Sequence, residues 1–440
     1  MEKLFLLFNL GVKYLRRYIR RYVFLFAALV FCFAVVTFIT SSKDSMYENV
    51  YYAAQSHYAG DVVVVGYNKD IPVTHHIGAG LVSSILTSAQ ESGINPLYTV
   101  KRAYLGNTGV VYFNGKPVVQ RYVIGCDWKS EEHLFSKMDF SSPVTELPGD
   151  DSVIISEPVA KQLNAAAGDI VTLEVENKWG QKNTGQFIVS GIVKDSSIFG
   201  YYKVYVSRLS LNRLLLFDDD DCSLIGFFFE NPSAAEKNRS ILHEAISKKI
   251  QTGPLLYNRD EMNKAIGEPD EWGWKGTNVF LFTLPVYLSE IANLMNAMDL
   301  LTYLLYTMML IIIFVSASVT YRLILHERTR EMGVMRAIGF YGADIRMVLW
   351  TEISILGFVS LITGFLLSAV FSTAASFISF SWFPSFEIFL RNGKLAALYL
   401  PGTVLFNILL TLFVLGLAVF IPAMRASNKN LPSLLSGEPL

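Results

Sequence analysis

The chain has 440 residues, of which 52% are hydrophobic and 17% are charged, and its formal net charge is −1. Its mean hydropathy is +0.37, whereas about a quarter of the residues in a soluble domain are charged. This composition indicates a membrane protein, and the near-neutral charge argues against a protein that binds nucleic acid.

The three cysteines, Cys32, Cys126 and Cys222, are too few for a disulfide scaffold and do not have the spacing of a metal site. Cys32 lies inside an apolar run, so only Cys126 and Cys222 are candidates for a bridge. A bridge requires a close and specific approach of the two side chains, and nothing in the sequence indicates one. We therefore favour two unpaired thiols over a bridge.

Four apolar segments are long enough to cross a membrane as helices, because a bilayer core about 30 Å thick requires roughly 20 apolar residues. Arg322 and Glu352, near the ends of two segments, are their only acidic or basic residues. The first segment lacks a following small-x-small cleavage site, so we expect a retained anchor rather than a signal peptide. The predicted spans are residues 22–40, 300–324, 352–380 and 398–421.

Basic residues predict the orientation of these spans, since Lys and Arg in short flanks stay on the cytoplasmic side. The turn between the third and fourth spans, residues 381–397, carries only Arg391 and Lys394. The N-terminal flank and the segment after the second span are richer: Lys3, Lys13, Arg16, Arg17, Arg20, Arg21; Arg322, Arg328, Arg330, Arg336, Arg346. We therefore expect a cytoplasmic amphipathic helix at 1–21, a cytoplasmic segment at 325–348, a cytoplasmic tail at 422–440 and an external region at 41–296.

The external region shows strand and helix patterns that predict a folded domain. Residues 61–67, DVVVVGY, predict a buried strand. Asn114-Gly115, between the apolar halves of VVYFNGKPVV, predicts a hairpin. A helix is predicted to begin at Ser156, as the N-cap of SEPVAKQL. Three strands follow in GDIVTLEV, GQFIVSGIV and YYKVYVS, then a helix over 231–250, a strand near 254–257, and helix again from about Glu261.

This pattern predicts two subdomains, one α/β and one mainly β around residues 100–200. Trp272 and Trp274 are predicted to anchor the chain at the membrane interface. The expected fold class is thus an α-helical membrane protein with four transmembrane helices and a large α+β domain inserted between the first two.

Catalytic signatures are missing from the sequence. It contains no P-loop, no H-E-x-x-H zinc motif and no G-x-S-x-G elbow. His75-His76 lacks further ligands at metal spacing. The acidic run at 218–221 lacks the glycine and the distal glutamate of a calcium loop. We interpret both as solvated loops, and expect neither catalysis nor a bound metal or cofactor. For Glu352, beside Trp350, snorkelling to the interface and a functional contact remain equally open.

The segment HERTREMGVMR, residues 326–336, places five charged residues and a histidine in eleven positions between two apolar spans. A helix from Arg328 to Ile338, stopped by Gly339, would align Met332, Met335 and Ile338 on one side. A helix lying on lipid headgroups is the simpler interpretation. The mixed charges and the short stripe favour insertion into a cytoplasmic partner protein.

Three parts of the sequence resemble the FtsX-like, MacB-type permease family. They are ERTREMGVMRAIGF followed by DIRMVLWTEISILGFVSLITGFLLS, then IPAMRASNKNLPSLL near the C-terminus, and in the external region VIISEPVAKQLNAAAGDIVTLEV with GQFIVSGIVKDSS. The external part is similar to the MacB and LolC/LolE branch. Ile421 replaces an aromatic residue that is usual in the family, and Lys429-Asn430 precede Leu431-Pro432.

The resemblance implies the non-catalytic permease subunit of an ABC transporter of the mechanotransmission type, in the bacterial inner membrane with a periplasmic domain and both termini cytoplasmic. ATP and magnesium would be bound by a separate ATPase dimer, and the permease would pair with a second copy or a paralogue. No nucleic acid is expected as a partner. The residues that match the family's ATPase-coupling segment are Arg328, Glu331, Met332, Gly333, Arg336, Ala337 and Gly339.

Four functions follow from this resemblance and from its limits. The first is release of lipoproteins from the inner membrane, as in LolC/LolE, with lipoprotein, membrane lipid and a periplasmic carrier as partners. The second is a MacB-like exporter of peptides or small amphiphiles, and the third an FtsX-like regulator of a cell-wall hydrolase. The fourth is a membrane-anchored sensor without an ATPase. We favour the first, because the external region resembles the LolC/LolE branch and the chain has no ATPase sequence.

Overall fold

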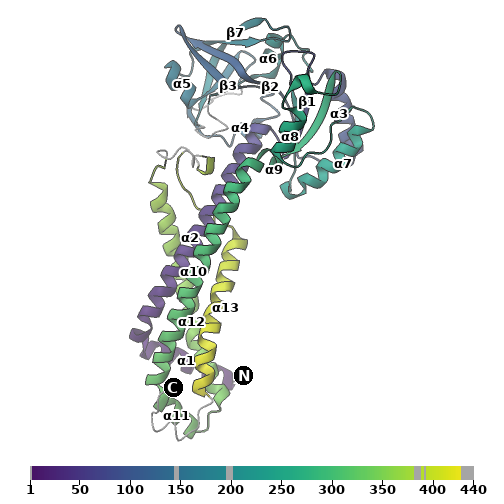
Figure 1. The fold of residues 1–440 in the computed structure, drawn as a ribbon. Coiled ribbons are helices and arrows are strands. Elements are labelled where there is room, and N and C mark those ends of the chain that lie inside the picture. The colour runs from purple at the N-terminus through teal and green to yellow at the C-terminus, as the bar shows by residue number, and fades with distance from the viewer. Residues whose placement is uncertain (1, 143–147, 195–201, 381–387, 391–392, 428–440) are drawn as a thin grey trace. The chain divides into compact units, whose positions relative to one another are not determined.

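The computed structural model (Figure 1) describes residues 2–142, 148–194, 202–380, 388–390 and 393–427. Most of the predicted turn at 381–397, and Lys429 to Pro432 of the C-terminal motif, lie outside the described residues. Contacts divide the chain into two units. The helical unit is formed by residues 1–47, 296–379 and 394–440, and the sheet unit by residues 48–295 and 380–393.

Among its described residues, the helical unit contains four helices that are long and apolar enough to cross a membrane. Each of the predicted spans falls within one of them, apart from the ends of the third and fourth. The helices that contribute to this unit are α1 (Glu2–Arg17), α2 (Ile19–Tyr58), α10 (Ser289–Glu327), α11 (Thr329–Ala337), α12 (Gly342–Ser376) and α13 (Pro401–Ser427). Their shared core is almost entirely aliphatic and aromatic, with Leu25, Ile313 and Ile353 at its centre.

The third helix, α12, lies nearer the N-terminus than predicted. It begins at Gly342 instead of residue 352 and ends at Ser376 instead of residue 380. The Asp344 carboxylate accepts the backbone N–H of Tyr341 at 2.9 Å and so caps the first turn, and a negative charge there also suits the helix dipole. Glu352 therefore lies well inside this helix and not at its end. The fourth helix starts at Pro401, a residue whose fixed φ suits a first helical position.

The part of the sheet unit that the structure describes contains ten strands and several short helices. The strands are β1 (Val62–Asn68), β2 (Tyr98–Phe113), β3 (Lys116–Cys126), β4 (Phe140–Ser142), β5 (Ser152–Ser156), β6 (Ile170–Glu176), β7 (Lys182–Val193), β8 (Lys203–Ser207), β9 (Leu224–Phe228) and β10 (Thr277–Thr283). The helices are α3 (Ala79–Glu91), α4 (Glu132–Phe135), α5 (Glu157–Leu163), α6 (Arg208–Leu215), α7 (Ala235–Ser247), α8 (Arg259–Ile266) and α9 (Leu284–Tyr287).

Strand pairing follows the predicted division into an α/β part and a mainly β part. In the first, β10, β1, β9 and the start of β2 form an antiparallel sheet. Helices α3 and α7 contribute to the core on one face of this sheet. In the second, β2, β3, β8, β5, β7 and β6 pair in a closed ring, since β6 pairs with both β7 and β2. The 16-residue strand β2 belongs to both parts.

Several local predictions are confirmed. Strand β1 is buried over Val62 to Val65, as its apolar run predicts, because it lies between β10 and β9. Asn114 and Gly115 join β2 to β3 with φ angles of 49° and 77°, which are the positive values that a two-residue hairpin of this type requires. Helix α5 follows Ser156, which occupies the N-cap position.

Three predictions for the end of this unit are wrong. No strand forms at residues 254–257, where only the preceding Thr252 makes an isolated bridge. The chain beyond Glu261 does not stay helical into the second span, because β10 intervenes. Trp272 is not an interfacial anchor: it is 6% exposed, stacks on Trp274 with ring centres 4.7 Å apart, and packs against Tyr67. In a short run of apolar residues such as β10, the spacing of apolar and polar residues does not distinguish a strand from a helix.

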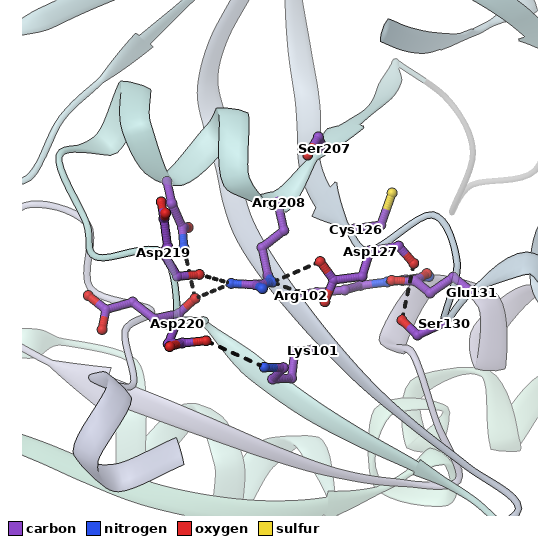
Figure 2. A network of polar contacts seen from close by, with 12 residues as sticks. Lys101, Arg102, Cys126, Asp127, Ser130, Glu131, Ser207, Arg208, Asp219 and Asp220 are labelled. Carbon is purple, nitrogen blue, oxygen red and sulfur yellow. Dashed lines mark hydrogen bonds and ion pairs between the residues drawn. The ribbon is translucent and has the colours of Figure 1, made fainter. Parts of the chain in front are cut away.

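Two buried arginines organise the polar interior of the sheet unit (Figure 2). Arg102 forms a double hydrogen bond with the Glu131 carboxylate, and both side chains are fully buried. The remaining guanidinium nitrogen of Arg102, Nη1, donates hydrogen bonds to the carbonyls of Ser56 and His57, at 2.7 and 3.1 Å. These carbonyls belong to the last turn of α2, where they have no partner within the helix. Arg102 is thus the C-terminal cap of α2.

The second arginine, Arg208, determines the conformation of the acidic run (Figure 2). Its Nε lies 3.2 Å from both carboxylate oxygens of Asp127, and its Nη1 donates to the carbonyls of Asp219 and Asp221. The Asp221 carboxylate is 3.0 Å from His76 Nε2. Asp218, Asp219 and Asp220 are exposed, as the interpretation as a solvated loop predicts. Asp221 is buried and joined to His76, so that interpretation is wrong only for this pair. Among the described residues no cluster of His, Cys, Asp and Glu could hold a metal.

All three cysteines are buried and unpaired. Burial raises the pKa of the Cys222 thiol to about 12 and raises the pKa of the Cys126 thiol well above its ordinary value. Because the thiolate is the reactive form, both thiols are expected to be inert in the folded protein.

We expect N-ethylmaleimide at pH 8 to leave Cys126 and Cys222 unmodified in the native chain and to modify both after unfolding, as measured by mass spectrometry of their peptides. A Val119→Cys variant is the control, because Val119 is 61% exposed and its replacement should react in the native state. Modification of Cys126 or Cys222 as fast as this control, or a bridge between them, would contradict the structure.

Replacement of Arg102 by methionine should lower the free energy of unfolding of the sheet unit by about 3–5 kcal/mol, because Glu131 would keep a buried charge without a partner. The measurement is chemical unfolding of the full chain in detergent, followed by tryptophan fluorescence. Lys248→Met is the control: Lys248 pairs with Glu244, both side chains are at least 69% exposed, and such pairs contribute at most about 1 kcal/mol. Equal effects of the two changes would show that the Arg102 pair is not a structural centre.

Candidate functional site

The charged segment that the sequence singles out forms α11, which follows α10 after the single residue Arg328. The helix ends in a Schellman motif: Phe340 N–H bonds to the Met335 carbonyl and Gly339 N–H to the Arg336 carbonyl, both at 3.1 Å. Gly339 has φ of 102°, in the left-handed region that glycine adopts without a steric penalty. The predicted helix and its stop at Gly339 are confirmed to within one residue.

An ion pair between Arg328 and Glu352 connects α11 to α12. Arg328 Nη1 lies 2.7 Å from Glu352 Oε2, and the two side chains are 4% and 0% exposed. Tyr22, in α2, donates its hydroxyl proton to the same oxygen at 2.7 Å. Glu352 is therefore not a snorkelling residue, because its carboxylate is fully enclosed. Three helical segments distant in sequence converge on this one carboxylate.

A second acidic residue and two tyrosines also contact the guanidinium group of Arg328. Glu331 Oε2 is 3.5 Å from Arg328 Nε, and Tyr18 donates a hydrogen bond to Glu331 Oε1. This hydrogen bond, with burial, raises the pKa of the Tyr18 phenol, so the phenol stays a donor at physiological pH. The guanidinium lies over the rings of Tyr14 and Tyr18, at 4.5 and 5.4 Å, where cation–π attraction adds to the ion pair.

Close packing of α1 on α12 holds Tyr14 and Tyr18 in place. A Cβ added at Gly11 would lie 2.9 Å from the side chain of Thr351, so only glycine allows the two helices to approach this closely. Tyr321 of α10 also donates a hydrogen bond to the Leu349 carbonyl at 3.1 Å. We call Arg328, Glu352, Tyr22, Glu331 and Tyr18 the polar knot.

The seven predicted coupling residues divide into an inner and an outer group. Arg328, Met332 and Gly333 are buried and Glu331 is half-buried, all within the helical unit. Met332 and Met335 belong to its hydrophobic core, which differs from the predicted partner-facing stripe of Met332, Met335 and Ile338. Arg336 is half-buried, while Ala337 and Gly339 are exposed.

The outer face of the segment contains Ile338, the one exposed member of the predicted stripe, and three residues that the pattern did not single out for contact. Val334 is 51% exposed, Ile338 70% and Tyr341 72%, and Arg330 is exposed beside them. Large apolar side chains gathered at the end of a helical bundle are typical of a surface that another protein covers. We call Arg330, Val334, Ile338 and Tyr341 the outer face.

Sequence reasoning missed Tyr18, Tyr22 and the pairing of Glu352. The position of Glu352 was the available signal, because an acid among apolar residues of a span requires a partner. The sequence does not distinguish Arg328 from Arg330 and Arg336 as that partner. Nothing in the sequence indicates Tyr18 or Tyr22, whose contacts depend on how α1 and α2 fold back onto α12.

Removal of either member of the ion pair should destabilise the helical unit by about 3–5 kcal/mol, because a buried charge remains without a partner. The single variants are Arg328→Met and Glu352→Leu. The double variant should lose much less free energy of unfolding than the two single variants together, since apolar side chains replace both charges. The measurement is equilibrium unfolding of the full chain in mixed detergent micelles.

Glu327→Leu is the matched control at the same end of the bundle, because the Arg21–Glu327 pair is 42% and 43% exposed. It should change the free energy of unfolding by no more than about 1 kcal/mol. Two results would show that the polar knot is not a coupled unit. One is a loss of unfolding free energy in the double variant equal to the sum of the single losses, and the other is a loss in each single variant no larger than that of Glu327→Leu.

The C-terminal part of the chain matches a known family. Residues 303–431 match the family described as FtsX-like permease C-terminal, a range that contains Arg328, Glu352 and all of α11. A search of curated proteins finds no match.

Two solved structures are similar to parts of the chain. One is the periplasmic region of MacB from Actinobacillus actinomycetemcomitans, at 12% identity and a TM-score of 0.30, covering 54% of this chain and 96% of that one. The other is a domain of a permease protein from Porphyromonas gingivalis, at 11% identity and a TM-score of 0.27, covering 51% and 89%. The family match confirms the resemblance drawn from the sequence over residues 303–431, and the chain carries an FtsX-like permease C-terminal domain.

Proposed function

We propose that this chain is the permease subunit of an ABC transporter, and that α11 transmits the motion of an ATPase, which the 440 residues do not contain, to the helices of the membrane. The observation that carries the proposal is the outer face, an exposed apolar and cationic surface on a helix anchored by a buried ion pair. The family match over residues 303–431 supports the same conclusion.

The inner and outer groups would have different roles. The outer face, with Ala337 and Gly339, would contact the ATPase. Arg328, Glu331, Met332 and Gly333 would fix α11 to the bundle. A buried ion pair is costly to separate, because each charge would lose its partner in a medium of low polarity. Force on α11 is therefore expected to move α10 and α12 with it, and not to bend the segment alone.

The two longest helices support transmission beyond the bundle. Helix α2 has 40 residues and α10 has 39, and at 1.5 Å per residue each is about 60 Å long. Both continue without interruption from residues of the helical unit into residues of the sheet unit. Arg102, as the cap of α2, joins the end of that helix to β2. We propose that these continuous helices carry the motion of α11 to the external region.

For the cargo we propose lipoproteins of the membrane in which the chain resides. The predicted spans contain no acidic or basic residue except Arg322 and Glu352, both near the predicted cytoplasmic ends. A charged cargo would find no polar path through such a bundle, whereas acyl chains match its apolar surface. Two permease chains per ATPase dimer are expected, because each ATPase requires a docking helix.

The test is native mass spectrometry of the full chain extracted from its own membrane through a tag. The wild type should carry an ATPase dimer, and the variant Val334→Asp/Ile338→Asp should lose it, because aspartate destroys the apolar contact of the outer face. The double variant should remain folded, since both side chains are exposed. Val119→Asp is the matched control, an equally exposed valine of the sheet unit, and should retain the ATPase.

An ATPase bound equally to the wild type and to the double variant would overturn the docking role of α11, and a wild type without any ATPase would overturn the transporter proposal. The same spectra test the cargo: a bound acylated polypeptide supports lipoprotein release. A wild-type complex that carries the ATPase and only peptides or small amphiphiles would overturn the cargo and leave the permease role intact.

A further inference from the structure

A small cavity lies between the ends of α10 and α13, away from the polar knot and from the outer face. Its volume is about 50 Å³, and it is lined by Arg322, Leu325, Ile421, Pro422 and Arg425. The two arginines are exposed. They lie at the predicted cytoplasmic ends of the second and fourth spans, the level at which lipid headgroups meet the protein.

Pro422 and Ser318 shape this cavity. Proline inside a helix has no N–H, so the carbonyl four residues before it loses its helical donor. That carbonyl belongs to Ala418, and it accepts the Ser318 hydroxyl of α10 at 3.0 Å. The hydrogen bond holds α10 and α13 together one turn away from the cavity. Since Arg322 is four residues after Ser318, the same contact brings the arginine to the cavity wall.

Arg322 and Arg425 have no hydrogen-bond or ion-pair partner within the part of the chain that the structure describes. Other arginines at this end are paired: Arg21 with Glu327 and Arg328 with Glu352. Two guanidinium groups on one small cavity repel each other unless an anion lies between them. The arrangement is therefore suited to a group that offers several negatively charged oxygens.

The surroundings indicate which anion the cavity fits. Leu323 follows Arg322, and Phe420 and Ile421 lie about one helical turn before Arg425; they are 61%, 46% and 50% exposed. The cavity is lined by the apolar side chains of Leu325, Ile421 and Pro422 as well as by the two arginines, so a ligand that occupies it meets both cationic donors and apolar side chains. Phosphate matches the planar fork of arginine, and basic pockets between transmembrane helices on the cytoplasmic side suit anionic headgroups.

We propose that the cavity between α10 and α13 binds the phosphate of an anionic phospholipid of the cytoplasmic leaflet, with Arg322 and Arg425 as the phosphate ligands. The acyl chains would lie along Leu323, Phe420 and Ile421. Only the headgroup of such a lipid would enter the cavity. Such a lipid would join α10 to α13 at the level of Pro422, and this role does not require the ATPase.

The experiment titrates the full chain in detergent with phosphatidylglycerol that carries a fluorophore on one acyl chain, with labelled phosphatidylcholine as the neutral comparison. Phosphatidylglycerol should bind more tightly than phosphatidylcholine. Arg322→Gln/Arg425→Gln should raise its Kd at least ~10-fold, since each basic side chain contributes strongly to anionic lipid binding. Arg425→Lys should lose less, because it keeps the charge.

Arg20→Gln is the control, an exposed arginine of the same predicted flank that lies outside the cavity, and should change the Kd less than about twofold. Thermal unfolding of each variant is measured in parallel, and the double variant should unfold at the wild-type temperature. If the double variant unfolds at a lower temperature, the single variants Arg425→Lys and Arg425→Gln are compared instead. A smaller loss of phosphatidylglycerol affinity with lysine supports the site, and equal losses overturn it.

Three results would overturn the proposal. Equal binding of the two lipids would show that no headgroup charge is recognised. Competition by inorganic phosphate as effective as that by unlabelled phosphatidylglycerol would identify free phosphate as the ligand. Unchanged lipid binding in the double variant, with loss of the co-purified ATPase, would assign the cavity to a protein interface.

Discussion

The structure of the helical unit depends on a carboxylate that cannot be exposed to lipid and therefore has to be paired inside the bundle. Glu352 lies in α12 among apolar neighbours, and Arg328 is the cation that neutralises it. Since Arg328 is the junction between α10 and α11, this pairing fixes where the charged segment begins and how it is oriented. Tyr22 of α2 and Tyr18, at the junction of α1 and α2, then each donate a hydrogen bond to one carboxylate of the cluster.

The sheet unit contains a second pair built on the same principle. Arg102 and Glu131 are both fully buried, and Arg102 also caps the last carbonyls of α2. In each unit, a buried arginine joins the end of a long helix to a neighbouring element. Breaking a buried pair of this kind costs much more free energy than breaking a surface pair, so both helices are held firmly at these residues.

Sequence patterns predicted elements whose stability is local. The Asn114-Gly115 hairpin, the start of α5 after Ser156, and the stop of α11 at Gly339 each follow from backbone preferences of one or two residues. Strand β10 was missed because the residue pattern of a short apolar run does not distinguish a strand from a helix. Trp272 and Trp274 were misplaced because a tryptophan near an apolar segment suits an interface and a core equally well.

What the sequence determined by itself was the presence of four apolar helices, the folded region between the first two of them, and the helix that ends at Gly339, because hydrophobic length and local backbone chemistry suffice for each. What the tertiary structure decided was which side of that helix is available to a partner. Helical spacing places Met332, Met335 and Ile338 on one side, but the packing of α1 and α12 buries both methionines and leaves Ile338 exposed. Burial depends on neighbours that are distant in sequence, and periodicity within one helix contains no information about them.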